Sequence, residues 1–254
     1  MKIGLIGAGR LGICLALLIE QEGYHVIASD VREDYVKDLQ NKKINSTEPQ
    51  VQELLEHSIN LEFTTDNRKV IRESDIIFTL VQTPSLEDGS YDVSAVWKVV
   101  EDIKQEMSSI ANYPKSFVVG CTTNPGDCDK FKDALPESVD VYYNPEFIAQ
   151  GSIIKDLQHA DMVLVGGDGK HVPVLRDIYE KIQLGYSIPN IHFMSTKAAE
   201  LTKIAVNCFL TTKVSYANQV GQVMIKDGLE DEVNTVLNAI GSDTRIGRKY
   251  LGFG

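Results

Sequence analysis

The first thirty residues constrain the fold most strongly, because they join a strand, a glycine-rich turn and a helix in that order. An apolar run of strand type, Lys2–Ile6, leads directly into Gly7-Ala-Gly-Arg-Leu-Gly12 and then into an apolar helical pattern. A second strand-like run, residues 24–29, ends in the acid Asp30. This order is typical of a βαβ unit in which a nucleotide diphosphate lies against the N-terminus of the helix.

Each glycine of this turn has its own physical reason. Gly7 allows the tight turn, Gly9 leaves the backbone open to a pyrophosphate, and Gly12 lets the helix pack closely on the strand. Asp30 can accept hydrogen bonds from both ribose hydroxyls and repels a 2′-phosphate, so NAD is favoured over NADP, although Arg32 nearby weakens this preference. The candidate dinucleotide-binding residues of this segment are Gly7, Ala8, Gly9, Arg10, Leu11, Gly12, Asp30 and Val31.

The glycines also allow two alternatives, which stay open at this point. A turn can collect glycines by chance, and a Rossmann-like domain can bind a different nucleotide. The strand before the turn, the helix after it and the acid at the expected distance favour dinucleotide binding, because that motif requires this context.

Strand and helix patterns alternate over the next 160 or so residues, which is typical of a parallel sheet with right-handed crossovers. We expect strands at residues 61–65, 75–81, 116–120, 140–143, 162–165 and 190–194, and helices at 31–41, 51–56, 93–110 and 172–182. Asp66 is placed to cap a further helix. The predicted fold class is α/β, a Rossmann-like doubly wound parallel sheet followed by a long central helix.

Ligands of such sheets lie at the carboxyl ends of the strands. Apart from the first turn and Asp30, this rule selects three loops that are rich in Gly, Pro, Thr and Asn. They are residues 82–85, which include Thr83 and Pro84, residues 121–126, which include Thr122, and residues 144–151, which include Glu146.

The alternation stops near Ser195. Residues 196–226 contain no proline and one glycine, and a continuous helix of this length would be roughly 45 Å long. Its apolar stripe favours a homodimer through this helix, and Lys203 and Asn207, four residues apart, share one of its faces. We therefore divide the chain into a dinucleotide-binding domain, 1–194, and a long helix with the start of a middle region, 195–254.

Composition excludes several classes of protein. The chain has 254 residues and a formal net charge of −11, without a basic stripe, so a nucleic-acid partner is not expected. No apolar run is long enough to span a membrane, and the N-terminus lacks a signal peptide, which favours a cytoplasmic protein. The four cysteines, Cys14, Cys121, Cys128 and Cys208, lack metal spacing, and the first and last fall in apolar helical runs typical of core residues.

Several ordered motifs make the chain resemble the UDP-glucose/GDP-mannose dehydrogenases from Met1 to Gly254. Glu48-Pro49 and Thr83-Pro84-Ser85 match short motifs of that family. Three longer segments also resemble motifs of the family. Cys121–Gly126 resembles its Ser-Thr-Val-Pro-x-Gly, and Asn144–Gly151 resembles its Asn-Pro-Glu-Phe-Leu-x-Glu-Gly. Ala199–Asn207 resembles its Ala-Glu-Leu-x-Lys-x-x-x-Asn. Residues 240–247 resemble its Ile-Gly-x-Asp-x-Arg-Ile-Gly.

The resemblance implies oxidation of the C6 alcohol of a nucleotide sugar, most simply UDP-glucose, to a carboxylate with two NAD per turnover. It also implies a cysteine nucleophile that forms a thiohemiacetal and then a thioester. Lys203 would stabilise the oxyanion, and Asn207 would hydrogen-bond the same oxygen or hold the water. Glu146 would be the general base of hydrolysis and Thr122 would orient the water, while Glu48, Thr83, Pro84, Thr122 and Glu146 would line the NAD site.

The chain also departs from the family pattern. Gln150 replaces a glutamate, and Asn124 replaces a proline, which puts the stiffness of its loop in doubt. The nucleophilic cysteine of the family follows a Gly-Phe-Gly-Gly run, and this chain stops at Gly254 before it. None of the four cysteines aligns with that nucleophile, and the second α/β domain of the family is also absent.

Three hypotheses follow, in order of preference. The first is the NAD-binding part of a nucleotide-sugar 6-dehydrogenase that is inactive by itself. The second is a smaller 3-hydroxyacid dehydrogenase, which shares the glycine turn and a Lys-x-x-x-Asn helix pair. The third is a non-catalytic NAD-binding module.

Overall fold

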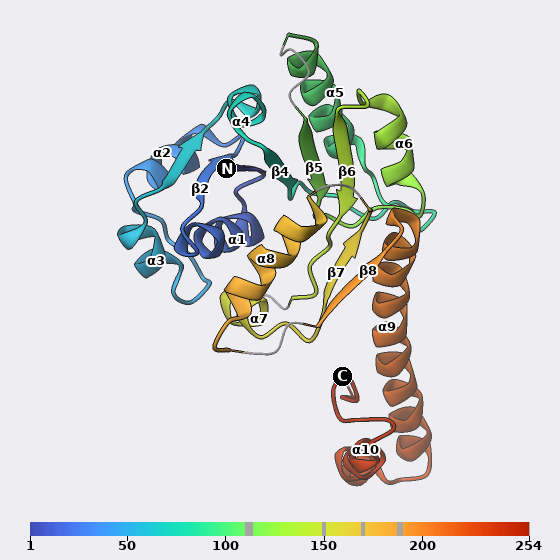
Figure 1. Ribbon diagram of the computed structural model, residues 1–254. Coiled ribbons are helices and arrows are strands. Elements are labelled where there is room, and N and C mark those ends of the chain that lie inside the picture. Colours follow the sequence, from blue (N-terminus) through green and yellow to red (C-terminus); the bar gives the residue numbers. More distant parts are fainter. Residues whose placement is uncertain (110–113, 149–150, 169–170, 187–189, 254) are drawn as a thin grey trace. The chain divides into compact units, whose positions relative to one another are not determined.

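A computed structural model describes residues 1–109, 114–148, 151–168, 171–186 and 190–253 (Figure 1). It divides into two compact units, Met1–Leu201 and Thr202–Gly254, which are taken in turn. Gln150, which departs from the family pattern, lies outside the described residues.

The first unit is built on an eight-stranded sheet with helices on both faces (Figure 1). Its strands are β1 Lys2–Ile6, β2 His25–Ser29, β3 Leu61–Thr64, β4 Ile76–Thr79, β5 Lys115–Val119, β6 Val139–Tyr143, β7 Val163–Gly166 and β8 Ile191–Met194. The strand order is β3-β2-β1-β4-β5-β6-β7-β8. The first six strands pair in parallel, so the carboxyl ends of these strands meet at one edge, as the alternation predicts.

The predicted α/β fold with a doubly wound parallel sheet is confirmed, and one strand pair departs from parallel pairing. β7 is antiparallel to β6, and the pairing rests on one residue pair, Tyr143 opposite Gly166, while β8 is parallel to β7. Alternation of strands and helices predicts the connections but leaves the direction of a strand with so short a ladder open. That direction depends on how the intervening helix packs, which the local pattern does not contain.

The helices of this unit are α1 Arg10–Gln21, α2 Glu33–Gln40, α3 Val51–His57, α4 Asn67–Glu73, α5 Ser94–Ser109, α6 Asp127–Ala134, α7 Ile153–Gln158, α8 Val172–Gln183 and the start of α9 Thr196–Lys226. Asp66 caps α4 as predicted, because its Oδ1 accepts from the Arg68 amide at 2.9 Å. The sequence pattern does not predict the short helices α6 and α7, because neither carries a long apolar period.

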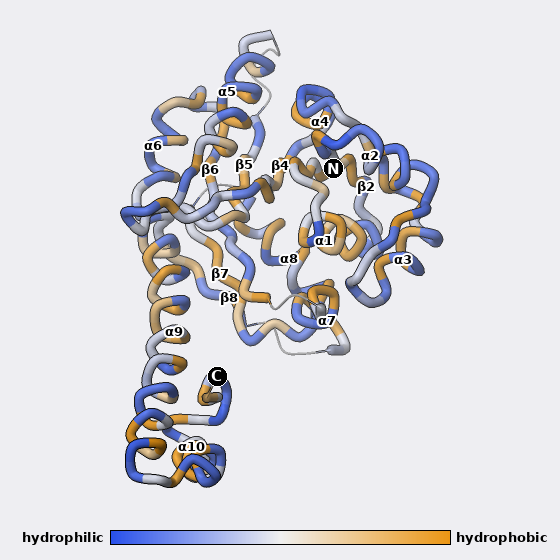
Figure 2. The backbone as a smooth tube through the Cα atoms, turned by 180° about the vertical axis from the view of Figure 1, so that it is seen from behind, coloured by the Kyte–Doolittle hydropathy of each residue, from blue (hydrophilic) through white to orange (hydrophobic). Residues whose placement is uncertain are grey.

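Both faces of the sheet are apolar, since alternate residues of each central strand face opposite sides. In β4, Ile76 and Phe78 join the core under α1, α7 and α8, whereas Ile77 joins the core under α4, α5 and α6. In Figure 2, apolar colour marks the strand β4 and most of α1, and the other covering helices alternate between apolar and polar segments. The sheet therefore provides a rigid support for the loops at its carboxyl edge.

The second unit contains the rest of α9, a 3-10 turn at Glu230–Glu232 and α10 Val233–Ser242. The 3-10 turn leads directly into α10. The core of the unit is small and consists of Ala217, Met224, Val233, Leu237 and Leu251. None of the described helices combines the length and apolar character that a bilayer span needs.

Candidate functional site

The glycine turn between β1 and α1 has the geometry expected of a diphosphate cradle. Gly7 has φ +100°, and a Cβ there would lie 2.6 Å from the Leu80 carbonyl oxygen, while a Cβ on Gly12 would lie 2.1 Å from the Gly7 oxygen. A Cβ on Gly9, in contrast, meets no atom of the described residues within 4 Å. The N-cap residue, Gly9, has no side chain that could cap α1. The turn therefore fits the diphosphate of NAD, because it is tight where protein packs and open where the ligand would lie.

Asp30, at the end of β2, is buried and held by Arg32. The Arg32 Nε and Nη2 atoms donate to the two carboxylate oxygens at 2.8 and 2.9 Å, and the Arg32 amide donates to Oδ1 at 3.0 Å. The guanidinium also lies 4.1 Å from the centroid of the Tyr35 ring. Asp30 is thus oriented by a bidentate pair and keeps acceptor capacity for a ribose hydroxyl. Val31 beside it is 84% exposed.

The loop after β4 lies beside the glycine turn, since the Leu80 amide donates to the Ile6 oxygen at 2.8 Å. Thr83 is half-buried and Pro84 is exposed. The loop is closed by a bridge between Ser85 and Tyr91. Two residues of the predicted cofactor site therefore lie on a closed loop next to the turn.

The loop after β5 carries Thr122, which is half-buried, and is held by a buried carboxylate that sequence reasoning did not single out. Glu200, in the first turn of α9, is fully buried. Its oxygens accept from the Thr123 hydroxyl at 2.8 Å and from the amides of Gly126 and Cys128 at 2.6 and 2.9 Å. The sequence does indicate that Glu200 could be buried, because this acid of the Ala199–Asn207 motif has apolar neighbours.

Glu146 lies in the loop after β6, and a buried tyrosine contacts its carboxylate. The Tyr179 hydroxyl, on α8, lies 2.9 Å from Glu146 Oε1 and 2.5 Å from Asn144 Oδ1. The Asn144 amide group is oriented by its bond to the Leu164 oxygen at 2.9 Å. Burial, and then the neighbouring Glu146 carboxylate, raise the pKa of Tyr179 well above its usual value, so the phenol stays protonated. Nothing in the local pattern of α8 indicates this contact.

Glu48, predicted to help hold NAD, has two backbone partners in this structure. Its Oε1 and Oε2 accept from the amides of Gly151 and Ile153 at 2.8 and 3.2 Å. The side chain is almost fully buried. Glu48 therefore fixes the end of the loop that carries Glu146.

Lys203 and Asn207 belong to the second unit and lie one helical turn apart on α9. Both side chains are half-buried. The Asn207 carbonyl accepts from the Thr211 hydroxyl at 3.2 Å, which is an ordinary contact within a helix.

The cysteines separate into two kinds. Cys14, Cys121 and Cys128 are buried, and burial raises the pKa of Cys14 and of Cys121 to about 12, which makes these thiols poor nucleophiles. The prediction that Cys208 is a core residue is wrong, because it is exposed on α9. The apolar run around it faces outward, since Leu201 and Phe209 are 58% and 65% exposed.

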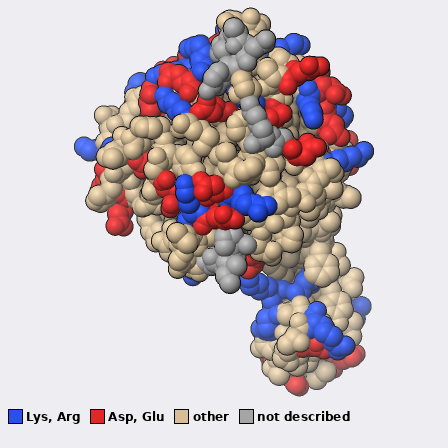
Figure 3. Space-filling model, in the orientation of Figure 1, with Lys and Arg blue, Asp and Glu red and all other residues tan. Residues whose placement is uncertain are grey.

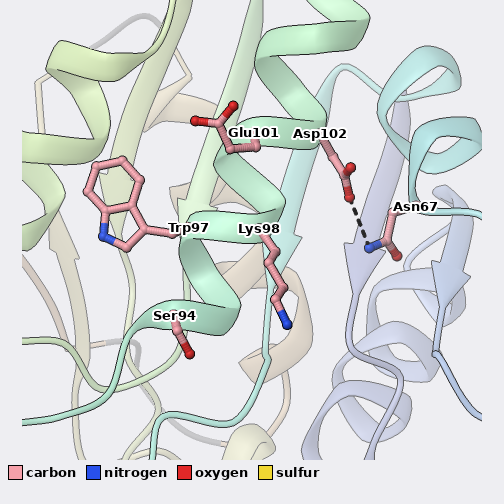
Figure 4. Close-up of a pocket in the computed structure, with 6 residues that line it drawn as sticks. All are labelled: Asn67, Ser94, Trp97, Lys98, Glu101 and Asp102. Carbon is pink, nitrogen blue, oxygen red and sulfur yellow. Dashed lines mark hydrogen bonds between the residues drawn. The ribbon is translucent and has the colours of Figure 1, made fainter.

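A separate hollow lies between α4 and α5 (Figure 4), lined by Asn67, Ser94, Trp97, Lys98, Glu101 and Asp102. Asn67 Nδ2 donates to Asp102 Oδ2 at 3.4 Å, and Asn67 Oδ1 accepts from the Ser29 hydroxyl at 2.7 Å. The face of the molecule in Figure 3 carries acidic and basic side chains interspersed. The side chains that line the hollow are mostly polar, and none of them belongs to the predicted cofactor site.

Comparison with known proteins agrees with this geometry. The NAD-binding domain of the UDP-glucose/GDP-mannose dehydrogenase family matches residues 1–183, and its central domain matches residues 197–254. The chain belongs to this family. It carries the family's NAD-binding domain, and NAD is the cofactor that this domain binds.

Curated relatives of the family align over the whole chain. UDP-glucose 6-dehydrogenase TuaD of Bacillus subtilis is 30% identical over 267 residues, and the UDP-glucose 6-dehydrogenase of Drosophila melanogaster is 32% identical over 273 residues. The chain spans 56% of the length of each. A UDP-glucose dehydrogenase structure from Pyrobaculum islandicum superposes with a TM-score of 0.88 at 27% identity, over 100% of this chain and 59% of that one.

Proposed function

We propose that the complete protein oxidises the C6 alcohol of UDP-glucose to a carboxylate, and that this chain is its NAD-binding and central part. The observation that carries the proposal is the set of strand-end loops: Thr122 and Glu146 lie on the carboxyl edge of the sheet that also carries the glycine turn. The two relatives named above are UDP-glucose 6-dehydrogenases, which supports this sugar over others.

The overall reaction consumes one alcohol, two NAD and one water, and yields one carboxylate, two NADH and three protons. NAD supplies the electron acceptor for both oxidations. The residues proposed to bind it are those of the glycine turn, Asp30 and Val31, together with Thr83, Pro84, Thr122 and Glu146. Asp30 would accept from the ribose while Arg32 holds its carboxylate in place.

Glu146 is proposed as the general base of the hydrolysis step, where it removes a proton from the attacking water. The Tyr179 hydroxyl has one proton and two acceptor neighbours, Asn144 and Glu146. Once Glu146 has taken up the proton of the water, it can donate to the Tyr179 oxygen while the phenol donates to Asn144. The contact therefore suits both protonation states of the base, and Thr122 would orient the water beside it.

Lys203 and Asn207 are proposed to stabilise the oxyanion that develops on the substrate carbon, as a cation and an amide donor can. The acyl group would be carried as a thioester by a cysteine outside this sequence, because Cys14, Cys121 and Cys128 are buried and none of the four cysteines matches the position of the family's nucleophile. Hydrolysis breaks the C–S bond, and the sulfur recovers its proton.

Three further proposals concern the whole protein. A homodimer would cover the exposed apolar face of α9, and the protein would act in the cytoplasm, where nucleotide sugars are made. The division into residues 1–194 and 195–254 would separate the dinucleotide-binding domain from the helix that leads toward a nucleotide-sugar domain.

The test uses two preparations. The complete protein should form two NADH per UDP-glucose, and a panel of UDP- and GDP-sugars and short 3-hydroxyacids should react more slowly. No NADH from any nucleotide sugar, or NADH from the hydroxyacids alone, would overturn the proposal.

The 254-residue chain should bind NAD in a calorimeter. Loss of the ribose contact in Asp30→Ala should weaken this binding roughly 10- to 100-fold, because a hydrogen bond to a charged group is worth about 1.5–3 kcal/mol. Asp34→Ala is the matched control, since the Asp34 side chain is 98% exposed and pairs only loosely with Lys37. Equal affinities of the two variants would contradict the assigned role of Asp30.

A further inference from the structure

The loop after β5 departs from the family pattern at Cys121, in place of serine, and at two adjacent positions, with Thr123 in place of valine and Asn124 in place of proline. A proline fixes its own φ angle, so the loop loses that restraint at position 124 and has it at Pro125 instead. The two adjacent replacements are polar, and both make hydrogen bonds that their counterparts cannot make. These hydrogen bonds can therefore offset the loss of stiffness expected at Asn124.

Asn124 binds the backbone of Tyr91 in both directions. Its Oδ1 accepts from the Tyr91 amide at 2.8 Å, and its Nδ2 donates to the Tyr91 oxygen at 3.0 Å. Tyr91 closes the loop after β4, because it bridges Ser85 and because the next amide, of Asp92, donates to the Pro84 oxygen at 2.8 Å. Asn124 thus joins the two loops that follow β4 and β5.

Asp127 determines the orientation of the Asn124 amide. Asp127 Oδ2 accepts from Asn124 Nδ2 at 2.8 Å and from the Asn124 backbone amide at 2.9 Å, and the Asp127 side chain is buried. The site therefore needs an acceptor toward the Tyr91 amide and a donor with two hydrogens toward the Tyr91 oxygen and Asp127. Asparagine provides this combination at the right length, and aspartate would place a second carboxylate against Asp127.

Thr123, the residue before Asn124, is also hydrogen-bonded to another segment. The Thr123 hydroxyl donates to the buried Glu200, which also accepts from the amides of Gly126 and Cys128. Thr122 therefore precedes two consecutive residues whose side chains are both hydrogen-bonded to other segments. Bonds from the loop after β4 and from α9 restrain the two positions at which the family pattern has valine and proline.

We propose that Asn124 is a positioning residue for Thr122. Through its bonds to Tyr91, Asn124 couples the loop after β4, which carries Thr83 and Pro84, to the loop that would orient the hydrolytic water. This inference rests on the proposed function. Removing the Asn124 amide should leave both oxidations in place, since both precede the attack of water, and should slow the hydrolysis that uses Thr122.

The kinetic test uses the complete protein and a double-mutant cycle. Asn124→Ala should slow steady-state NADH formation roughly 10- to 100-fold, the scale expected when a reacting group is misplaced by about an ångström. Both NADH should still form in a rapid burst, two per active site, because the thioester forms before water attacks it. In a Thr122→Ala background the same change should have no further effect. Multiplying effects, or a lost burst, would overturn the proposal, because Asn124 would then not act through Thr122.

A second readout needs neither NAD nor turnover. In the 254-residue chain, Asn124→Ala should speed amide hydrogen exchange in residues 120–128 and 85–92 at least tenfold, and Asn124→Asp should do so more strongly. Asn190→Ala is the control, since the Asn190 side chain is exposed and its amide lies at a long 3.4 Å from the Asp161 oxygen. Unchanged exchange in both loops would overturn the coupling. If UDP-glucose is not oxidised by the wild type, the proposed function fails while this exchange result still decides whether the loops are joined.

Discussion

The two units of the chain differ in how they bury apolar surface. In Met1–Leu201, helices cover both faces of the sheet, and each face has its own large core. In Thr202–Gly254 the buried apolar core of the described residues has five members, and Phe209, Val223 and Ile225 are exposed by 65%, 59% and 46%. The first unit buries most of its apolar side chains in these two cores, whereas the second exposes several along one helix, an apolar area that another surface can cover.

The close contacts of Gly12 test how tightly the first unit is packed around the glycine turn. Gly12→Ala would place a Cβ 2.1 Å from the Gly7 carbonyl oxygen, where only backbone can give way. We expect a loss of about 3 kcal/mol or more in the free energy of unfolding, with NAD binding abolished. Urea unfolding and calorimetry with NAD measure the two effects. A variant with wild-type affinity would contradict the packing argument at this turn.

The exposed face of α9 tests what covers the second unit. Phe209→Ser should split a homodimer into single chains, because the ring contributes a large apolar area to the outer face of α9. Light scattering measures the mass of wild type and variant at equal concentration. Thr212→Ala is a control on the same helix, since its hydroxyl bonds the Cys208 carbonyl of its own helix. A wild type that stays a single chain at all concentrations would argue against the dimer.

Gly221→Ala tests the opposite case in the second unit. Its Cβ would come as close to a neighbouring atom as that of Gly12→Ala, but we expect only a small change in stability. A Cβ there would lie 2.1 Å from the Phe253 ring, but that ring is 41% exposed and can move. Alanine also favours a helix interior over glycine by about 1 kcal/mol. The net change in unfolding free energy should therefore stay within about 1 kcal/mol. A loss as large as that of Gly12→Ala would show that Phe253 is fixed in place.

Alkylation of the exposed thiol of Cys208 should have the smallest effect on stability among these predictions. At neutral pH Cys208 should react with iodoacetamide while Cys14, Cys121 and Cys128 stay protected, and the labelled protein should unfold at the same urea concentration. Burial raises the pKa of Cys14 and Cys121 from 9.0 to about 12. The unfolded chain therefore loses these protons first, so the free energy of unfolding should fall as the pH rises above 9. Mass spectrometry of peptides reports the labelled sites, and rapid labelling of Cys14 would refute its burial.

The parts of the molecule that follow from short-range chemistry could be predicted from the sequence. Gly7 and Gly12 need their small size for contacts within the turn and with the next strand end, and Asp66 caps α4 two residues away. The alternating pattern also predicts most strands and helices within one or two residues. These features depend on neighbours in sequence or on the regular geometry of a βαβ unit.

The missed features depend on partners distant in sequence. Glu200 reaches Thr123 across 77 residues, and Tyr179 reaches Glu146 across 33. Each is an ordinary acid or phenol in its own helix, and only the fold supplies its partner. The exposure of Cys208 was missed for a related reason, since an apolar stripe predicts burial without saying whether the covering surface belongs to the same chain.

The bonds of Glu48 have a consequence for how the chain folds. They join residues separated by 103 and 105 positions, and closing a loop of that length costs entropy before the contacts form. Contacts of high sequence separation slow folding. The segment with Glu146 should therefore acquire its final order late, after the first βαβ unit has assembled, and a nascent chain still short of Ile153 on the ribosome could not yet make this closure.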